Sequence, residues 1–156
     1  MKKEGFNVEL VTEYAKDCVY NKQFDLLKND QLFVLANQNR RIQSIIESNE
    51  NVEYIITDSP LLLSKIYAEE NGYEKNFISF SEFCVDLFAS YENINIVLNR
   101  DGIVYDPNGR IQNCIRAQEL DTKILKELQF WKFPYTLIVD RNISKHFLEN
   151  INILNV

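Results

Sequence analysis

Histidine and glycine are scarce in this sequence, which has one histidine, His146, and 4 glycines among 156 residues. His146 stands on a predicted short helix, where nothing suggests a ligand or a catalytic base, and no Ser-His-Asp or Cys-His set for nucleophilic catalysis is evident in the sequence. No apolar run approaches the roughly 18 residues that a transmembrane helix needs. Met1–Glu4 leads into no apolar segment of a signal peptide. We therefore expect a cytoplasmic protein with no membrane partner.

Basic charge is also limited, because 17 Lys and Arg face 23 Asp and Glu and leave a net charge of −6. A protein that binds nucleic acid mainly through its phosphates needs a clustered basic surface. We therefore expect no nucleic-acid partner.

The three cysteines, Cys18, Cys84 and Cys114, have a spacing that fits no metal motif. Their number is odd, so at least one of them has no partner within the chain. Reduced thiols are typical of cytosolic proteins, and buried thiols behave as small apolar side chains. We expect this packing role for all three, with a reactive thiol as the alternative.

Short apolar, β-branched runs alternate with helical patterns along the chain. Gly5 and Asn71-Gly72 carry turn or helix-end signals, and Thr12 is the expected N-cap of the first complete helix. The expected strands are Phe6–Val11, Val52–Ile56, Ile94–Leu98, Tyr135–Val139 and a last edge strand at Ile151–Val156. The expected helices are Glu13–Tyr20, Leu26–Glu47, Pro60–Glu70, Phe80–Tyr91, Ile115–Gln129 and Ser144–Asn150.

This alternation predicts an α/β protein with a mainly parallel sheet between two layers of helices. Strands covered on both faces are short, apolar and β-branched, as these are. We find no internal repeat and no linker, and a chain of 156 residues suits one domain. The expected domain therefore spans residues 1–156.

An acid stands directly after one of these strands. Asp58 follows Val52–Ile56, and ligands of parallel α/β folds bind outside the carboxyl ends of the strands. Asp58-Ser59-Pro60 is equally a good start for a helix, with Asp58 as its N-cap and Pro60 in its first turn. The sequence leaves both roles open for Asp58.

Three segments together carry a family resemblance: VTEYAKD (Val11–Asp17), TDSPLLLSKIYAE (Thr57–Glu69) and YDPNGRIQ (Tyr105–Gln112). In these segments the chain resembles the AAA-type ATPase/kinase family that is similar to nicotinamide riboside kinases and phage nucleotide kinases. The resemblance covers about residues 1–142. It implies a P-loop fold like that of nucleoside-monophosphate kinases, with ATP and Mg²⁺ as cofactors and a small nucleoside or nucleotide as substrate.

The resemblance implies roles for residues near the first two strands. Asp58 would hold Mg²⁺ through water or orient the acceptor, and Glu13 would be the general base towards a sugar hydroxyl. Tyr14 would stack on a base, and Gln38 and Arg41 would contact the base or phosphate of the acceptor. The alternatives are a first-turn acid at Glu13 that complements the helix dipole, a core or surface aromatic at Tyr14, and a solvated helix face at Gln38 and Arg41.

The resemblance also implies a lid at about residues 100–118. Its arginines, Arg110 and Arg116, would stabilise the charge of the transferred phosphoryl group. Arg141 would lie near the adenine of the cofactor. The alternatives are surface salt bridges for Arg110 and Arg116 and, after the last main strand, a plain helix cap by Asn142.

The chain departs from the family because no G-x-x-x-x-G-K-[ST] phosphate loop occurs in it. In the family that loop follows a mid-sheet strand, which is flanked by the strands that correspond here to Val52–Ile56 and Ile94–Leu98. Without it we expect these two strands to pair directly, or a homo-oligomer or a complementing chain to cover their edges.

Three explanations of the missing loop remain open: a truncated kinase, a fragment completed by a partner chain, or a degenerate family member. We expect ATP-dependent phosphorylation of a nucleoside or nucleotide by the complete form and weak or no catalysis by this chain alone. The alternative is a non-catalytic, phage-encoded pseudo-kinase that binds a nucleotide or a protein.

Overall fold

A computed structural model of the chain describes residues 1–2, 5–48, 51–72, 77–99 and 114–138. The chain divides into two compact units, each of which is considered by itself. Unit 1 comprises Met1–Asn93 and Pro107–Ile124, and unit 2 comprises Ile94–Asp106 and Leu125–Val156. The expectation of a single domain stays a prediction.

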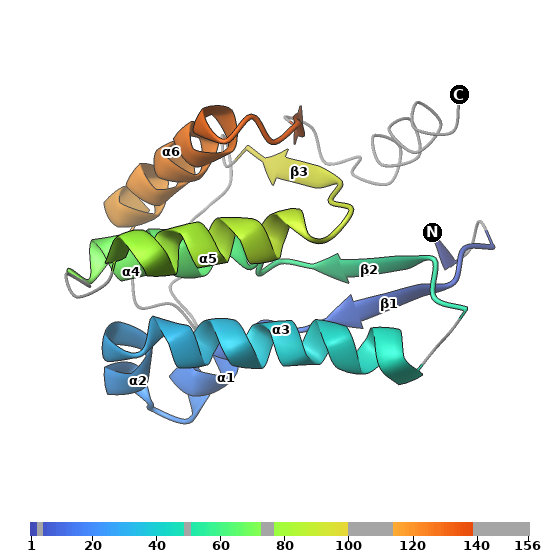
Figure 1. The fold of residues 1–156 in the computed structure, drawn as a ribbon, viewed down its shortest axis with the longest axis horizontal. Helices are drawn as coiled ribbons and strands as arrows, with labels where there is room; N and C mark the ends of the chain where they lie inside the picture. The colour runs from blue at the N-terminus through green and yellow to red at the C-terminus, as the bar shows by residue number, and fades with distance from the viewer. Residues whose placement is uncertain (3–4, 49–50, 73–76, 100–113, 139–156) are drawn as a thin grey trace. The chain divides into compact units, whose positions relative to one another are not determined.

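Unit 1 is built around a pair of parallel strands, β1 (Val8–Val11) and β2 (Tyr54–Thr57). Val8 lies opposite Tyr54 and Val11 opposite Thr57, so the two strands end together. Figure 1 shows the long helix α3 (Gln31–Ser48) running beside this pair. The other helices of the unit are α1 (Tyr14–Tyr20), α2 (Phe24–Asn29), α4 (Leu62–Glu70), α5 (Phe77–Ala89) and the first part of α6 (Cys114–Phe130).

The core of unit 1 forms where these helices cover one another and the strands. Leu35, Ile66 and Cys84 are each at most 1% exposed, and they come from α3, α4 and α5. A second group, Cys18, Leu27 and Val34, joins α1, α2 and α3. Cys18 and Cys84 are both free thiols and both buried, which confirms their expected role as small apolar side chains.

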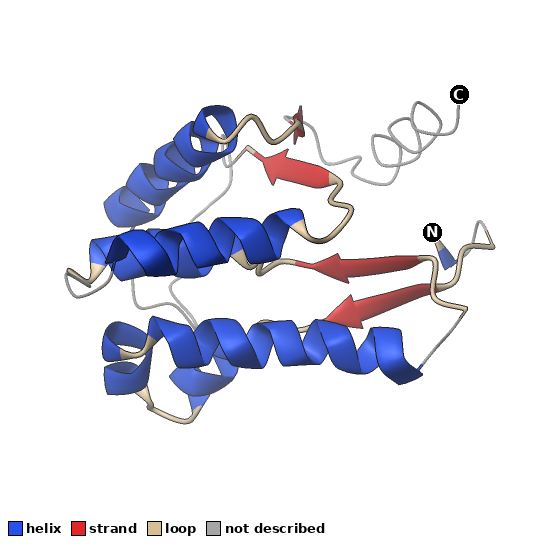
Figure 2. Cartoon of the chain, viewed as in Figure 1, coloured by secondary structure: helices blue, strands red, loops and turns tan. Residues whose placement is uncertain are grey.

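Unit 2 contains a second parallel pair, β3 (Asn95–Leu98) and β4 (Tyr135–Ile138), with Asn95 opposite Tyr135. The last part of α6, from Leu125 on, belongs to this unit. Its end is fixed by the Phe133 amide, which donates to the Leu128 carbonyl at 2.9 Å, and by the Trp131 indole, which donates to Glu127 at 3.0 Å. The two red strand pairs in Figure 2 are therefore separate two-stranded sheets.

The predicted class, α/β with parallel strand pairing, is confirmed by these elements. Direct pairing of Val52–Ile56 with Ile94–Leu98 would join the two units, and it stays a prediction. β2 pairs with β1, and β3 pairs with β4. Each of the two strands is therefore paired along one edge. That a second chain covers the other edge stays a prediction.

The expected helix Leu26–Glu47 is interrupted at Asp30, which separates α2 from α3. The backbone of Asp30 has φ −136° and ψ 66°, outside the helical region. Its carboxylate accepts a hydrogen bond from the Phe33 amide at 3.0 Å, as an N-cap side chain does. Apolar residues keep their spacing across the break, so the pattern alone conceals it.

Two predicted helix starts are also wrong. The N-cap of α1 is Glu13, with no side-chain capping bond, because the Thr12 hydroxyl accepts a hydrogen bond from Arg41 instead. The N-cap of α4 is Leu61, and the helix begins beyond Pro60. Asp58 is therefore not the N-cap of α4. Gly5 and Gly72 both have positive φ, as their predicted turn or helix-end roles require.

The predicted helix Ser144–Asn150, the edge strand Ile151–Val156 and the loop Val104–Gly109 lie outside the described residues.

Candidate functional site at the carboxyl ends of β1 and β2

The residues that follow β1 and β2 lie at the same edge of the sheet. Val11 and Thr57 are register partners in parallel strands, so Thr12 and Asp58 leave the sheet side by side. Glu13 and Tyr14 follow Thr12 at the start of α1, and Ser59 follows Asp58. The carboxyl ends of parallel strands are where α/β proteins place ligands.

Gln38 of α3 ties these two ends together. Its Oε1 accepts a hydrogen bond from the Tyr14 backbone amide at 2.8 Å. Its Nε2 lies 3.5 Å from the Thr12 carbonyl oxygen and 3.4 Å from Thr57 Oγ1, and donates to both. The side chain is 3% exposed, so these partners replace the water that it loses on burial. The alternative of a solvated helix face is therefore wrong for Gln38, which positions the β1–α1 junction against β2.

Arg41, one turn further along α3, contacts the same junction. Its Nη1 donates to Thr12 Oγ1 at 2.9 Å and to the Thr12 carbonyl at 3.1 Å. Its Nη2 pairs with Asp17 Oδ2 at 2.5 Å. The guanidinium carbon lies 5.1 Å from the centre of the Tyr14 ring, within the range of a cation–π contact. The arginine side chain keeps 30% of its surface in solvent, so it can still meet a ligand.

Tyr14 supplies a neutral aromatic ring to this edge. Burial and a hydrogen bond with Cys18 raise the pKa of Tyr14 above its ordinary value of 10.0. The phenol is therefore protonated at neutral pH. The Phe33 ring meets the Tyr14 ring edge-on at a centroid distance of 6.1 Å. Tyr14 is thus fixed from two sides, by Arg41 and by Phe33.

Two carboxylates flank the fixed groups. Asp58 is exposed immediately beyond β2, where the Ser59 amide donates to Thr57 Oγ1 at 3.1 Å and turns the chain. Glu13 is half-buried at the N-cap of α1, in an extended backbone conformation with φ −68° and ψ 120°. A carboxylate in either place can accept the proton of a hydroxyl or bind a water of a hydrated cation.

The predicted lid residues are not brought to this edge by any described contact. Arg116 lies on α6, where it pairs with Glu70 at the end of α4 and with Glu119 at 2.6 Å. Lys123 joins Glu70 at 2.8 Å and Glu69 at 3.1 Å. Arg116 thus forms salt bridges, which was the alternative to a role in a lid. The role in a lid stays a prediction. Arg110 and Arg141 lie outside the described residues.

Within the described residues, no group of three or more His, Cys, Asp or Glu side chains could hold a metal ion. Mg²⁺ is usually bound by one or two carboxylates together with substrate phosphates and waters. An exposed carboxylate such as Asp58 fits that partial role. In the same part of the chain, no helix is long and apolar enough to cross a membrane.

Sequence reasoning named Tyr14, Gln38 and Arg41 but missed the residues that hold them. Thr12 and Thr57 each stand at or just beyond the carboxyl end of a strand, which is a signal for this edge. Asp17 lies three residues after Tyr14, on the same face of α1. Their partners on α3 are more than 18 residues away in the chain, so only the fold brings them together.

Comparison of the chain with protein-family models, with curated proteins and with solved structures gave no match in any of the three. The resemblance to nucleotide kinases therefore rests on the three segments quoted above and stays a prediction.

Proposed function

We propose that the chain binds a small nucleoside or nucleotide at the carboxyl ends of β1 and β2, as the acceptor-binding part of a P-loop kinase. The observation that carries this proposal is the buried Gln38, which holds the Tyr14 amide and the ends of both strands in one arrangement. Sites whose shape must persist are built on side chains fixed in this way.

Each residue at the edge has a chemical task in such a site. The neutral ring of Tyr14 offers a stacking surface for a base, and Arg41 offers a cation for a phosphate or donors for a base. Glu13 accepts the proton of the sugar hydroxyl that is phosphorylated. Asp58 would hold a water of Mg²⁺ if a phosphate-loop segment brought the ion and ATP to this edge, and the ion would there supply positive charge to the phosphates.

The parallel pairing of β1 with β2 and of β3 with β4 supports the proposed fold. In P-loop kinases the phosphate-loop strand lies between the strands that correspond to β2 and β3, so each of these two needs one free edge. β2 and β3 each have a single strand partner among the described residues. The residues present do not fit the phosphates of ATP, because the sequence contains no phosphate loop. A further segment or a second chain would supply it.

Binding without phosphoryl transfer is the second candidate function. It is favoured by the ion pair of Arg41 with Asp17, which already neutralises the cation nearest the edge. A complete kinase must concentrate positive charge on the phosphates, and the described part of this edge carries both signs. In this candidate the edge holds a nucleoside or nucleotide, or a partner protein, and no phosphoryl group moves.

Calorimetric titration of the chain with nucleosides, nucleoside monophosphates and ATP with Mg²⁺ tests the proposal. We expect saturable binding of a nucleoside or monophosphate that weakens at least about tenfold in Arg41→Ala, equivalent to about 1.4 kcal/mol. Arg40→Ala is the matched control, because Arg40 is the adjacent residue on α3 and contacts Glu47 rather than the strand ends.

Equal loss in both arginine variants, or no binding by the wild-type chain, would contradict the site. Phosphoryl transfer is tested separately. The chain with ATP, Mg²⁺ and the bound acceptor is expected to turn over very slowly, and a fused phosphate-loop segment is expected to raise that rate. Binding without any transfer after such a fusion supports the second candidate.

A further inference from the structure

A groove of about 400 Å³ lies between α3 and α5. Leu32, Ala36 and Arg40 line it from α3, and Phe83 and Leu87 line it from α5. Figure 1 shows the two helices side by side and running in the same direction, because residue numbers increase along both towards the same end of the unit.

The groove presents large apolar side chains to solvent. Leu32 is 49% exposed and Phe83 is 50% exposed, on opposite walls. Most of a large side chain is normally removed from water when a neighbour is available. Apolar residues that gather around a depression mark an interaction site more often than single exposed ones do.

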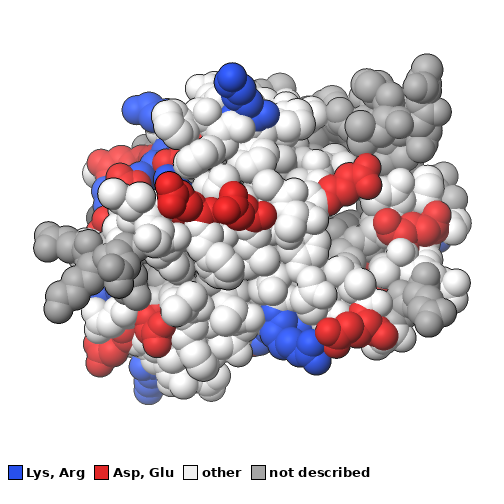
Figure 3. All heavy atoms as spheres, viewed as in Figure 1, with Lys and Arg blue, Asp and Glu red and all other residues white. Residues whose placement is uncertain are grey.

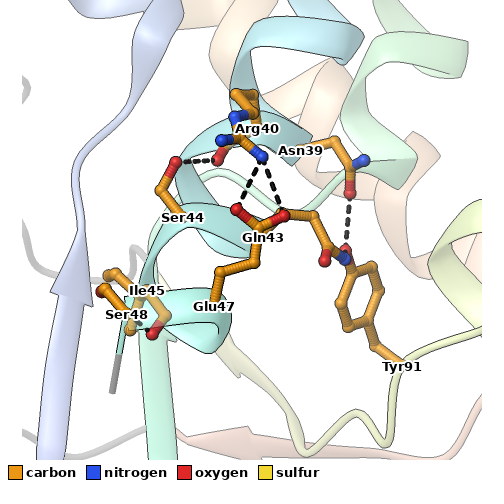
Figure 4. A network of polar contacts seen from close by, with 8 residues as sticks. All are labelled: Asn39, Arg40, Gln43, Ser44, Ile45, Glu47, Ser48 and Tyr91. Atoms are coloured by element: carbon orange, nitrogen blue, oxygen red, sulfur yellow. Dashed lines mark hydrogen bonds and ion pairs between the residues drawn. The ribbon is translucent and has the colours of Figure 1, made fainter. Parts of the chain in front are cut away.

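Asn39 and Gln43, which line the groove from α3, belong to a polar network with Tyr91 of the segment after α5 (Figure 4). The Tyr91 hydroxyl donates to Asn39 Oδ1 at 2.6 Å, and Gln43 Nε2 donates to the Tyr91 oxygen. On the same stretch of α3, Arg40 Nη1 lies 2.9 Å from both carboxylate oxygens of Glu47. The groove thus has an apolar centre and fixed polar lining residues.

The α5 wall is acidic, and the α3 wall carries the cation of Arg40 beside its partner Glu47. The only charged residues of α5 are Glu82 and Asp86, both exposed and next in sequence to the lining residues Phe83 and Leu87. On the other wall Arg40 is exposed, with a side chain 65% accessible. Figure 3 shows acidic atoms over α5, basic atoms beside acidic ones along α3, and a largely uncharged surface between them.

We propose that this face binds a second copy of the chain. A twofold axis along the groove would place α3 of one copy over α5 of the other, with their directions matched. Arg40 would then meet Asp86 of the second copy, twice in each dimer, and the apolar centre would pack on itself. Such a self-complementary pattern is what an isologous interface requires.

The contact would be small. α5 has 13 residues and is therefore about 20 Å long at about 1.5 Å per residue. A face of two such helices side by side is at the lower end of the size of stable interfaces, where association is weak. The pair of Arg40 with Glu47 in the same helix is exposed, so exchanging it for an intermolecular pair costs little.

Size-exclusion chromatography with light scattering measures the molar mass of the protein and so tests the proposal. The chain is loaded at up to about 200 µM, because a weak interface forms only at high concentration. We expect a dimer for the wild type and a monomer for Phe83→Asp. Arg40→Glu and Asp86→Arg should each be monomeric, because each places like charges opposite one another twice. Circular dichroism should show that all three exposed-site variants keep the wild-type helix content.

The decisive sample is an equimolar mixture of Arg40→Glu and Asp86→Arg. In the proposed dimer both intermolecular pairs of the mixed species are again of opposite sign, so a heterodimer should form from two monomeric variants. A wild-type protein that stays monomeric at every concentration overturns the proposal. A groove that binds a different protein instead would give this result. Dimers that persist in the single variants, or a mixture that stays monomeric, overturn it as well.

Discussion

The two sides of α3 differ in how completely their polar groups are used within the chain. Arg41 donates to Thr12, pairs with Asp17 and lies against the Tyr14 ring, all on other elements. Among the described residues, the guanidinium of Arg40, its neighbour, contacts Glu47 on the same helix. One side of α3 therefore holds the strand ends, and the other side is the one that we propose for a second copy of the chain.

The two glutamines of α3 repeat this contrast. Gln38 is buried and bonds to the backbone of Tyr14 and Thr12. Gln43 is half-buried and bonds to a side chain, the hydroxyl of Tyr91. Backbone groups cannot move to water without distorting the fold, whereas a half-buried tyrosine can. The same residue type thus has a fixed structural role on one side and an adjustable role on the other.

The largest expected difference is between Leu32 and Leu35, the two leucines of α3 that line the groove. Leu35 is 1% exposed, and Leu35→Ala should destabilise the protein by about 2–5 kcal/mol, through lost transfer free energy and a cavity. Leu32 is 49% exposed, and Leu32→Ala should cost less than about 1 kcal/mol. Urea denaturation followed by circular dichroism measures both, and equal losses would show that the groove is closed in solution.

Removing the side-chain amide of Gln38 should have the next largest effect. Gln38→Leu leaves the partly buried Tyr14 amide without its partner and should cost about 1–3 kcal/mol. Gln43→Leu is the control and should cost under about 1 kcal/mol, because Tyr91 keeps its bond to Asn39. Urea denaturation curves of the two variants measure both losses of stability. Similar values for both would remove the distinction between the two sides of α3.

Cys84 extends the comparison to α5. It lies on the buried side of this helix, and the acids Glu82 and Asp86 lie on the exposed side. Burial raises the pKa of the Cys84 thiol from 9.0 to about 12. The protonated thiol therefore contributes stability that is fully present below pH 9.0, where the unfolded chain is also protonated, and is lost as pH rises towards 12.

Cys84→Ala should accordingly be most destabilising at neutral pH, with a deficit that shrinks by on the order of 1 kcal/mol by about pH 10. The measurement is urea denaturation of both proteins at several pH values from neutral to about 10. A deficit that does not change with pH would mean that the thiolate of Cys84 is not excluded from the fold.

The smallest effect should come from the arginines. Arg41→Ala removes a hydrogen-bonded ion pair with a 30% exposed side chain and should cost about 0.5–1 kcal/mol, reduced by added salt. Arg40→Ala removes an exposed pair within one helix and should cost about 0–0.5 kcal/mol. Thermal unfolding at low and high salt compares them. A greater loss for Arg40 would reverse the assignment of the two sides.

Local pattern was enough to predict most helices and strands. The spacing of apolar residues indicated α1, α4, α5 and α6, and the β-branched runs indicated all four strands that the structure describes. The break at Asp30 was missed because the apolar spacing continues through it and only the capping bond to Phe33 reveals it. Thr12 was assigned to a cap because its competitor for that hydroxyl, Arg41, is 29 residues away.

The candidate site was predicted only in part, because some of its residues are held by partners that are distant in the sequence. Asp58 and Glu13 follow strands directly, so their place at the sheet edge can be inferred from the sequence. Gln38 stands on the polar side of a helical pattern, which indicates solvent rather than burial. Its partners are 19 to 26 residues distant in the chain, and a one-dimensional pattern contains no information about them.

Backbone amide NMR during titration with a nucleoside, a nucleoside monophosphate and ATP with Mg²⁺ tests the central claim most directly. The Tyr14 amide donates to Gln38, so its resonance reports any ligand that disturbs the strand ends. The proposed site predicts saturable shifts at Tyr14, Asp58 and Ser59, and none that saturate together at Phe83 and Leu87 in the groove. Saturating shifts that leave Tyr14 and Asp58 unchanged, or no shifts with any of the three compounds, would contradict it.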